Sequence, residues 1–137
     1  KIDMPIAAGE RIYSRWQFIP YFENRSIQVI QPDIANCGGL TEVKKICDMA
    51  HAYDIVAQIH TCGSPLQTSI AMQLEAAIPN FCIHEHHKRV RTKWMEGLTK
   101  HNPHPVDGYL AVPDEPGIGN EIMPLAYERA DEIKTIQ

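Results

Sequence analysis

The sequence predicts an α/β fold built from parallel βα units, on the basis of one continuous stretch and one recurring interval. Residues 27–60 contain a β-branched run, a Gly38-Gly39 turn, an amphipathic segment and a second apolar run, which is the order of a parallel βαβ unit. Ionisable residues follow four predicted strands at intervals of 23, 27 and 25 positions. Such an interval suits one βα module of a (β/α)8 barrel, which takes about 250 residues in full. We therefore expect the chain to form half of such a barrel.

Each predicted element rests on a local pattern of apolar residues and on the turn residues that bound it. Apolar β-branched runs predict strands, and apolar residues repeated every three or four positions predict helices. Pro65 suits the first turn of a helix, whereas Pro20 argues against an uninterrupted helix around it. The expected strands are residues 4–8, 27–30, 55–59 and 81–83, and the expected helices are residues 11–24, 41–52 and 66–78.

The sequence changes character after the fourth strand. Residues 1–90 hold the βα modules, whereas residues 91–137 are mixed in charge and rich in turn residues. Within this second region we expect a strand at 107–112 and a helix at 123–136. We expect the region to pack on something other than the modules of its own chain. Half a barrel has two exposed sheet edges, so we do not expect it to be stable alone.

Composition and charge argue against several classes of partner. The net charge of -4 and the pI of about 5.9 argue against binding to nucleic acid or to an anionic membrane. No apolar run approaches the roughly 20 residues of a membrane span. The chain starts at Lys1 without a signal-peptide pattern, and we interpret this start as a cut. The cysteines have no metal-knuckle spacing, so we expect reduced thiols in a cytoplasmic protein and no zinc; they are Cys37, Cys47, Cys62 and Cys82.

Asp33 and His60 follow two consecutive predicted strands. The loops after the carboxyl ends of parallel strands form the active face of such folds, and neighbouring strands lie about 4.8 Å apart. The two side chains could therefore form an aspartate–histidine dyad, in which the carboxylate fixes the imidazole tautomer for general acid/base work. Alternatively, Asp33 caps the next turn and His60 is a polar residue at a strand end. Spacing alone does not decide between these interpretations.

Glu10 follows the first predicted strand and is a candidate metal ligand. Gly9 before it would allow the close approach of a ligand, and strand-end carboxylates suit a hard cation such as Mg²⁺. Alternatively, Glu10 is a surface residue in the first turn of a helix, where the helix dipole favours it. Without further context the second interpretation is the stronger one.

Glu85 follows the fourth predicted strand and would face the same cavity as His60. Its histidine neighbours suggest a metal cluster, but consecutive residues on a strand point to opposite faces. Only alternate members of His84, His86 and His87 can converge, which argues against a zinc site.

Several motifs together resemble the C-terminal part of the enolase superfamily, in the subgroup of mandelate racemase and the acid-sugar dehydratases. They cover nearly the whole chain in the family's order and are most similar to galactonate and mannonate/gluconate-type dehydratases. The motifs are residues 5–11 (PIAAGER), Gln31-Pro32-Asp33, residues 38–41 (GGLT), His60, residues 83–85 (IHE), residues 107–110 (DGYL) and residues 116–122 (PGIGNEI).

The resemblance implies strands five to eight of a (β/α)7β barrel, followed by a tail that returns to a capping domain. On this mapping Glu10 is the third Mg²⁺ ligand, and Asp33 with His60 forms the catalytic dyad. Glu85 would hydrogen-bond the substrate carboxylate or the enediolate made from it. Arg11 and His60 would also contact the acid-sugar substrate. Family members are commonly homo-oligomers, so we expect full-length protomers to associate.

The family's reaction starts with removal of the proton α to a carboxylate, while Mg²⁺ stabilises the enediolate. A dehydratase then expels the β-hydroxyl group, and His60 could be either the base or the acid. The other metal ligands, a further acid/base residue and the capping domain would precede Lys1, so we expect these residues alone to be inactive. The loop at 61–64 differs from the Cys-Pro-like loop of galactonate-type members, which leaves the sugar open.

Two other functions remain open at this point. A racemase or epimerase on the same fold would use His60 as one of two opposed bases, and its product would have inverted configuration without loss of water. A non-catalytic chain would keep the half-barrel for assembly or binding. In that case Asp33→Asn and His60→Asn would leave the function intact.

Overall fold

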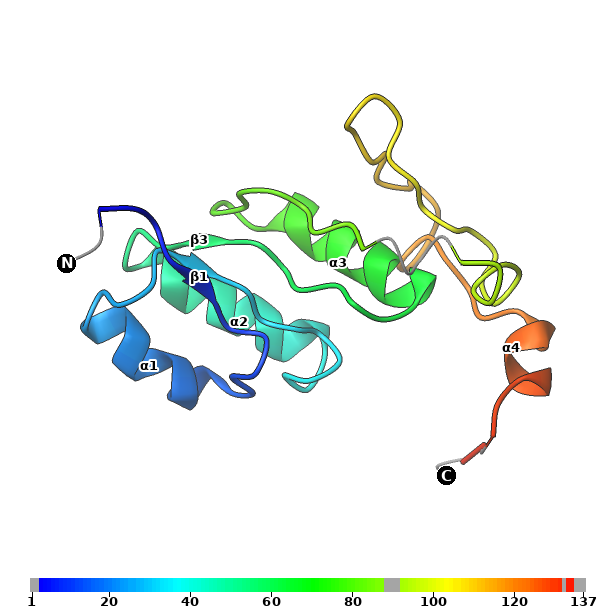
Figure 1. The fold of residues 1–137 in the computed structure, drawn as a ribbon, viewed down its shortest axis with the longest axis horizontal. Coiled ribbons are helices and arrows are strands. Elements are labelled where there is room, and N and C mark those ends of the chain that lie inside the picture. Colours follow the sequence, from blue (N-terminus) through cyan, green and yellow to red (C-terminus); the bar gives the residue numbers. More distant parts are fainter. Residues whose placement is uncertain (1–2, 88–91, 132, 135–137) are drawn as a thin grey trace.

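A computed structural model describes residues 3–87, 92–131 and 133–134 as a small parallel sheet with helices packed on it, followed by an irregular tail (Figure 1). The α/β prediction is confirmed. The elements are β1 (Ala7–Ala8), α1 (Arg15–Glu23), β2 (Val29–Ile30), α2 (Leu40–His51), β3 (Val56–Ala57), α3 (Pro65–Ala77) and α4 (Pro124–Glu128).

The sheet is parallel, with the strand order β1-β2-β3. Its strands lie where the sequence predicts them but are shorter, because regular pairing is limited to two residues on each strand. Beyond β2 and β3 the pairing continues as an isolated parallel bridge between Asp33 and His60. The predicted strand at 81–83 is reduced to one bridge between Phe81 and Ala57, with backbone hydrogen bonds to one neighbour only.

The hydrophobic core lies between the sheet and the helices that follow its strands. Helices α1 and α2 lie together on one side of the sheet, and α3 extends from the same layer towards the tail (Figure 1). Fully buried side chains from the first two helices and the strands fill this layer, and they include Phe18, Phe22, Ile30, Ile46 and Ile59. Burial of this apolar surface holds the short strands in register.

Helix α1 differs from the prediction at its first residue and at Pro20. It begins at Arg15, because the preceding residues form a turn in which the Ile12 N–H donates to the Gly9 carbonyl at 2.9 Å. It also runs through Pro20, which removes one backbone hydrogen bond. Phe18 and Phe22 on either side are fully buried and stacked, and this packing outweighs the lost bond.

Helix α2 follows the predicted periodicity, and α3 lies within one residue of its predicted bounds. The buried residues of α2 recur at the i, i+3, i+4 and i+7 positions and are Val43, Ile46, Cys47 and Ala50. In α3, the Ser64 side chain accepts a hydrogen bond from the Gln67 N–H, and Pro65 opens the first turn. After α3, the buried Asn80 amide donates to the Cys47 and Ile55 carbonyls, which ties the fourth strand segment to α2 and β3.

The tail is less regular than predicted. The predicted strand at 107–112 is wrong, because Asp107 and Gly108 both have positive φ and form a tight turn closed by a Val106–Tyr109 bridge. The predicted helix at 123–136 ends at Glu128, and residues 129–131 and 133–134 are not helical. Helix α4 buries none of its side chains, so no packing extends its apolar pattern into a longer helix. Residues 132, 135 and 136 lie outside the described part.

All four cysteines are free, and Cys37 and Cys47 are buried. Within residues 3–87, 92–131 and 133–134, no helix has the length and apolar character needed to cross a bilayer.

The packing of α1 makes a first prediction about stability. Replacing Phe18 by alanine is expected to lower the free energy of unfolding by about 3–5 kcal/mol, because the ring is fully buried and leaves a cavity. Urea unfolding of a protein of full barrel length that carries these residues, followed by circular dichroism, measures the change. Trp16→Ala on the same helix is the control, and it is expected to change the value by less than about 1 kcal/mol because Trp16 is 64% exposed. Equal losses in the two variants would contradict this packing.

Candidate active site

The bridge beyond β2 and β3 brings Asp33 and His60 together at the carboxyl end of the sheet. The backbone N–H of His60 donates to the Pro32 carbonyl at 3.1 Å, which sets the two residues side by side. The side chains then meet, with His60 Nδ1 2.7 Å from Asp33 Oδ2. Strand register alone therefore places a carboxylate against an imidazole.

Both sequence interpretations of Asp33 describe its environment. Its Oδ1 accepts hydrogen bonds from the backbone N–H groups of Ala35 at 2.7 Å and Asn36 at 3.0 Å, so Asp33 does cap the following turn. Its Oδ2 faces His60 and also accepts from the Gln67 side-chain amide at 3.0 Å. Asp33 is only 4% exposed. Because its other partners are all donors, the carboxylate is an acceptor and His60 Nδ1 carries the proton of their shared bond.

Glu10 completes a line of three ionisable side chains. Its Oε2 lies 3.0 Å from His60 Nε2, on the opposite side of the ring from Asp33, and its side chain is 52% exposed. With Nδ1 protonated, His60 can donate to Glu10 only as the imidazolium cation. The open side of Glu10 and the Nε2 edge of His60 therefore face the same region at the ends of β1 and β3.

Gly9 lies where the chain packs closely on the adjoining strand segment. A Cβ at this position would lie 2.8 Å from the backbone nitrogen of Gln31 and 3.2 Å from the Phe18 ring. The close neighbour is therefore the adjoining strand segment, and φ of +147° adds to the need for glycine. Gly9 allows the backbone before Glu10 to pack closely on the backbone before Asp33.

Arg11 and Glu85 occupy the edges of this region. The Arg11 side chain is 86% exposed, with Nε 3.6 Å from Glu10 Oε1. Glu85 Oε2 accepts a hydrogen bond from the Thr61 N–H at 3.2 Å, and the Thr61 hydroxyl donates to the Glu85 carbonyl. Thr61 thus fixes Glu85 one residue beyond His60. From the sequence, Thr61 is only the first residue of the loop at 61–64.

The described residues supply one suitable oxygen ligand for the Mg²⁺ that the resemblance implies. Mg²⁺ is usually held by one or two carboxylates, with water and substrate oxygens in its other positions. The half-exposed carboxylate of Glu10 fits that requirement. No group of three or more His, Cys, Asp or Glu side chains in the part of the chain that the structure describes is arranged to hold a metal ion.

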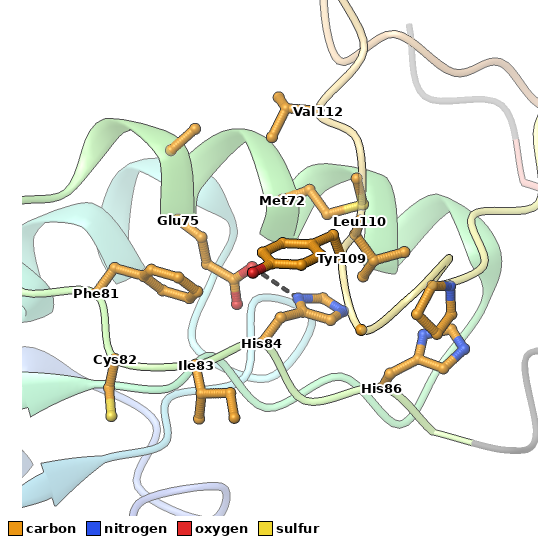
Figure 2. Close-up of a pocket in the computed structure, with 13 residues that line it drawn as sticks. Met72, Glu75, Phe81, Cys82, Ile83, His84, His86, Tyr109, Leu110 and Val112 are labelled. Atoms are coloured by element: carbon orange, nitrogen blue, oxygen red, sulfur yellow. Dashed lines mark hydrogen bonds and ion pairs between the residues drawn. The ribbon is translucent and has the colours of Figure 1, made fainter.

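His84 and His86 face a separate cavity of about 400 Å³ on the α3 side of residues 81–86 (Figure 2). His84 Nδ1 lies 2.6 Å from Glu75 Oε2, and the rings of His84 and His86 are 6.3 Å apart. Tyr109 and Leu110 from the tail close the cavity on the other side (Figure 2). Burial raises the pKa of Glu75 above its ordinary value, and the hydrogen bond from His84 partly offsets this rise. The consecutive residues His84 and Glu85 therefore lie in different places, His84 in this cavity and Glu85 beside Thr61.

Comparison with known proteins finds sequence similarity along nearly the whole chain. The family model described as "Enolase C-terminal domain-like" matches residues 1–126. A D-xylonate dehydratase of Haloferax volcanii is 34% identical over 115 residues, which are 84% of this chain and 28% of that protein. A D-galactonate dehydratase of Xanthomonas campestris is 32% identical over 136 residues, which are 94% of this chain and 35% of that protein. The chain thus spans about a third of the length of these relatives.

Solved structures are also similar to nearly the whole chain. A member of the enolase superfamily from Salmonella Typhimurium is 51% identical with a TM-score of 0.89, over 94% of this chain and 33% of its own. An enolase from Pantoea ananatis, solved with bound D-gluconate and Mg, is 29% identical with a TM-score of 0.80, over 89% of this chain and 29% of its own.

The raised pKa of the buried Glu75 predicts how the free energy of unfolding depends on pH. Because its pKa is raised in the folded chain, the folded form binds its proton more tightly than the unfolded form does. The contribution of Glu75 to stability is therefore present below its ordinary pKa of 4.5 and is lost as pH rises through the folded pKa. Urea unfolding between about pH 4 and about pH 7 is expected to show this decline, and Glu75→Gln is expected to remove it.

Glu115→Gln is the matched control for this titration. Its carboxylate has a lowered pKa because Lys100 and His101 donate hydrogen bonds to it, so its contribution is lost as pH falls. The two variants should therefore change the pH dependence in opposite directions. A Glu75→Gln profile with the same slope as the unmodified protein would contradict the burial of an ionisable carboxyl here.

Proposed function

Because the chain belongs to the enolase C-terminal domain-like family, we propose that it supplies the acid/base part of the active site of a Mg²⁺-dependent acid-sugar dehydratase. The observation that carries the proposal is the 2.7 Å contact between His60 Nδ1 and Asp33 Oδ2, with the half-exposed Glu10 at the other ring nitrogen. A buried carboxylate behind an imidazole orients the ring and fixes its tautomer, which suits the imidazole to general acid/base catalysis.

In this proposal His60 moves the proton through Nε2. Asp33 holds the proton on Nδ1 and stabilises the imidazolium that forms when Nε2 takes up a second proton. The same nitrogen can return its proton to a leaving hydroxyl group, so the arrangement suits His60 either as the base or as the acid of the elimination. Because Asp33 is almost fully buried, the imidazole stays oriented in both protonation states.

Glu10 and Glu85 have supporting roles in the proposal. Glu10 would be one ligand of Mg²⁺, which when bound neutralises negative charge that develops on the substrate carboxylate. Glu85 has one oxygen held by the Thr61 N–H and would direct its carboxyl group to the substrate. The exposed Arg11 would contact the acid sugar from the rim.

The names of the relatives support a class of substrate. Two of them are named for xylonate and galactonate, and a solved structure contains gluconate, all of which are sugar acids with a hydroxyl group next to the carboxylate. We propose a substrate of this aldonate class, without choosing among these sugars. We further propose that the 137 residues alone do not catalyse the reaction, because the family's Mg²⁺ site takes further protein ligands besides the one that corresponds to Glu10.

The proposal predicts a large effect of His60→Asn on turnover. In a protein of the relatives' full length that carries these residues, aldonates with Mg²⁺ should give an α-keto acid with loss of water. His60→Asn is expected to lower kcat about 10²–10⁴-fold, because the group that transfers the proton is lost. Assays of D-xylonate, D-galactonate and D-gluconate measure the product. His51→Asn, at the end of α2, is the control and should keep full activity.

Three outcomes would contradict this proposal in different ways. Full activity of His60→Asn would leave the dyad without a catalytic purpose. Inverted configuration at the α-carbon without loss of water would indicate an epimerase instead of a dehydratase. Turnover by the 137 residues alone would show that the chain does not need the further metal ligands.

A further inference from the structure

We propose that Gln67 is a positioning residue for the Asp33–His60 dyad. In this proposal Gly63 leaves free the space that the side-chain amide of Gln67 occupies. The side-chain amide would hold the Asp33 carboxylate in the one orientation that keeps Oδ2 against His60 Nδ1. The catalytic meaning of this device rests on the proposed function, but the device itself can be observed without substrate.

The contacts of the Gln67 amide are specific to the dyad. Its Nε2 donates to Asp33 Oδ2 at 3.0 Å, and this oxygen also accepts the hydrogen bond from His60 Nδ1. The same nitrogen lies 3.5 Å from the backbone carbonyl of His60. Gln67 is 9% exposed and Asp33 is 4% exposed, so water has little access to this hydrogen bond. One amide therefore contacts both members of the pair.

Gln67 adds a restraint that the loop of Asp33 does not supply. The Oδ1 contacts come from Ala35 and Asn36, which belong to the same turn as Asp33 and move with it. The Gln67 contact comes from the first turn of α3, 34 positions along the chain. Rotation of the carboxylate about its χ2 angle would break it. Gln67 thus fixes the acceptor oxygen relative to the strand that carries His60.

The local sequence holds Gln67 in place on two sides. The Ser64 side chain accepts a hydrogen bond from the Gln67 backbone N–H and so caps the helix at this residue. A Cβ added to Gly63 would lie 1.9 Å from Gln67 Oε1 and 3.0 Å from its Cδ. Both atoms belong to the end of a flexible side chain, so an alanine here is expected to displace the amide while the backbone stays in place.

The test measures how well the proton on His60 Nδ1 is protected from solvent, by ¹⁵N-resolved NMR of the ring N–H signals. Gln67→Met keeps the side-chain volume and removes the donor. It is expected to increase the exchange rate of the His60 Nδ1 proton about tenfold, which is the effect of losing one hydrogen bond to a charged group. The proton shared by His84 Nδ1 and Glu75 is the internal reference and should not change. Gln73→Met is the matched control, since Gln73 lies on the same helix and donates to the Pro113 carbonyl.

Gly63→Ala tests the same contact without changing Gln67. It is expected to increase His60 exchange to a similar degree, and the double variant should show no further increase because both changes remove one interaction. Unchanged His60 exchange in either single variant would overturn the proposal. So would equal increases at His60 and His84, which indicate general loosening of the fold. A His60 Nδ1 proton that is unprotected in the unmodified protein would also overturn it.

These readings are independent of the proposed function. A protein that shows the predicted exchange rates but no aldonate dehydration would keep the positioning role and lose the dehydratase assignment. Dehydration with unchanged exchange in Gln67→Met would do the reverse.

Discussion

The contact between Asp33 Oδ2 and His60 Nδ1 depends on the parallel register of β2 and β3, and the candidate site is organised around it. A shift of one residue in that register would turn one side chain to the other face of the sheet. Asp33 would then be a buried carboxylate without its imidazole, which is costly in a protein interior. The chemistry of the site and the pairing of the strands therefore favour the same arrangement, and the packing of α1 and α2 on the sheet stabilises both.

The ionisable side chains at the three strand ends are buried to different degrees. Asp33 lies inside and is held by donors from its own turn and from α3, His60 lies between, and Glu10 reaches the surface. This gradient suits a buried carboxylate that orients the imidazole from behind, with a second carboxylate in front that is open to a cation. Just after the strand segment at 81–83, the Glu85 side chain lies at this site, where the Thr61 N–H donates to it. The neighbouring His84 instead lies in the cavity beside Glu75 (Figure 2).

The parallel βα order, the helix positions and the location of the dyad could be predicted from the sequence, because each leaves a periodic or recurrent signal. The 27-position interval between Asp33 and His60 reflects one βα module, and parallel modules place their ends together. The contacts of Gln67 with Asp33 and of Glu10 with His60 could not be predicted, since side-chain contacts between distant segments leave no local pattern. The tail was overpredicted for a related reason. An apolar periodicity at 123–136 indicates a long helix only where packing buries its apolar side chains, and α4 buries none of its side chains.

Paramagnetic broadening by Mn²⁺ tests whether the strand ends place a cation ligand beside an acid/base imidazole, as we propose. Mn²⁺ takes the same oxygen ligands as Mg²⁺. If Glu10 binds it, the ring signals of His60 should broaden at lower Mn²⁺ concentrations than those of His84 and His101, because Glu10 Oε2 lies 3.0 Å from His60 Nε2. Glu10→Gln should abolish this preference. Broadening that is equal at the three histidines, or that persists in Glu10→Gln, would contradict the claim.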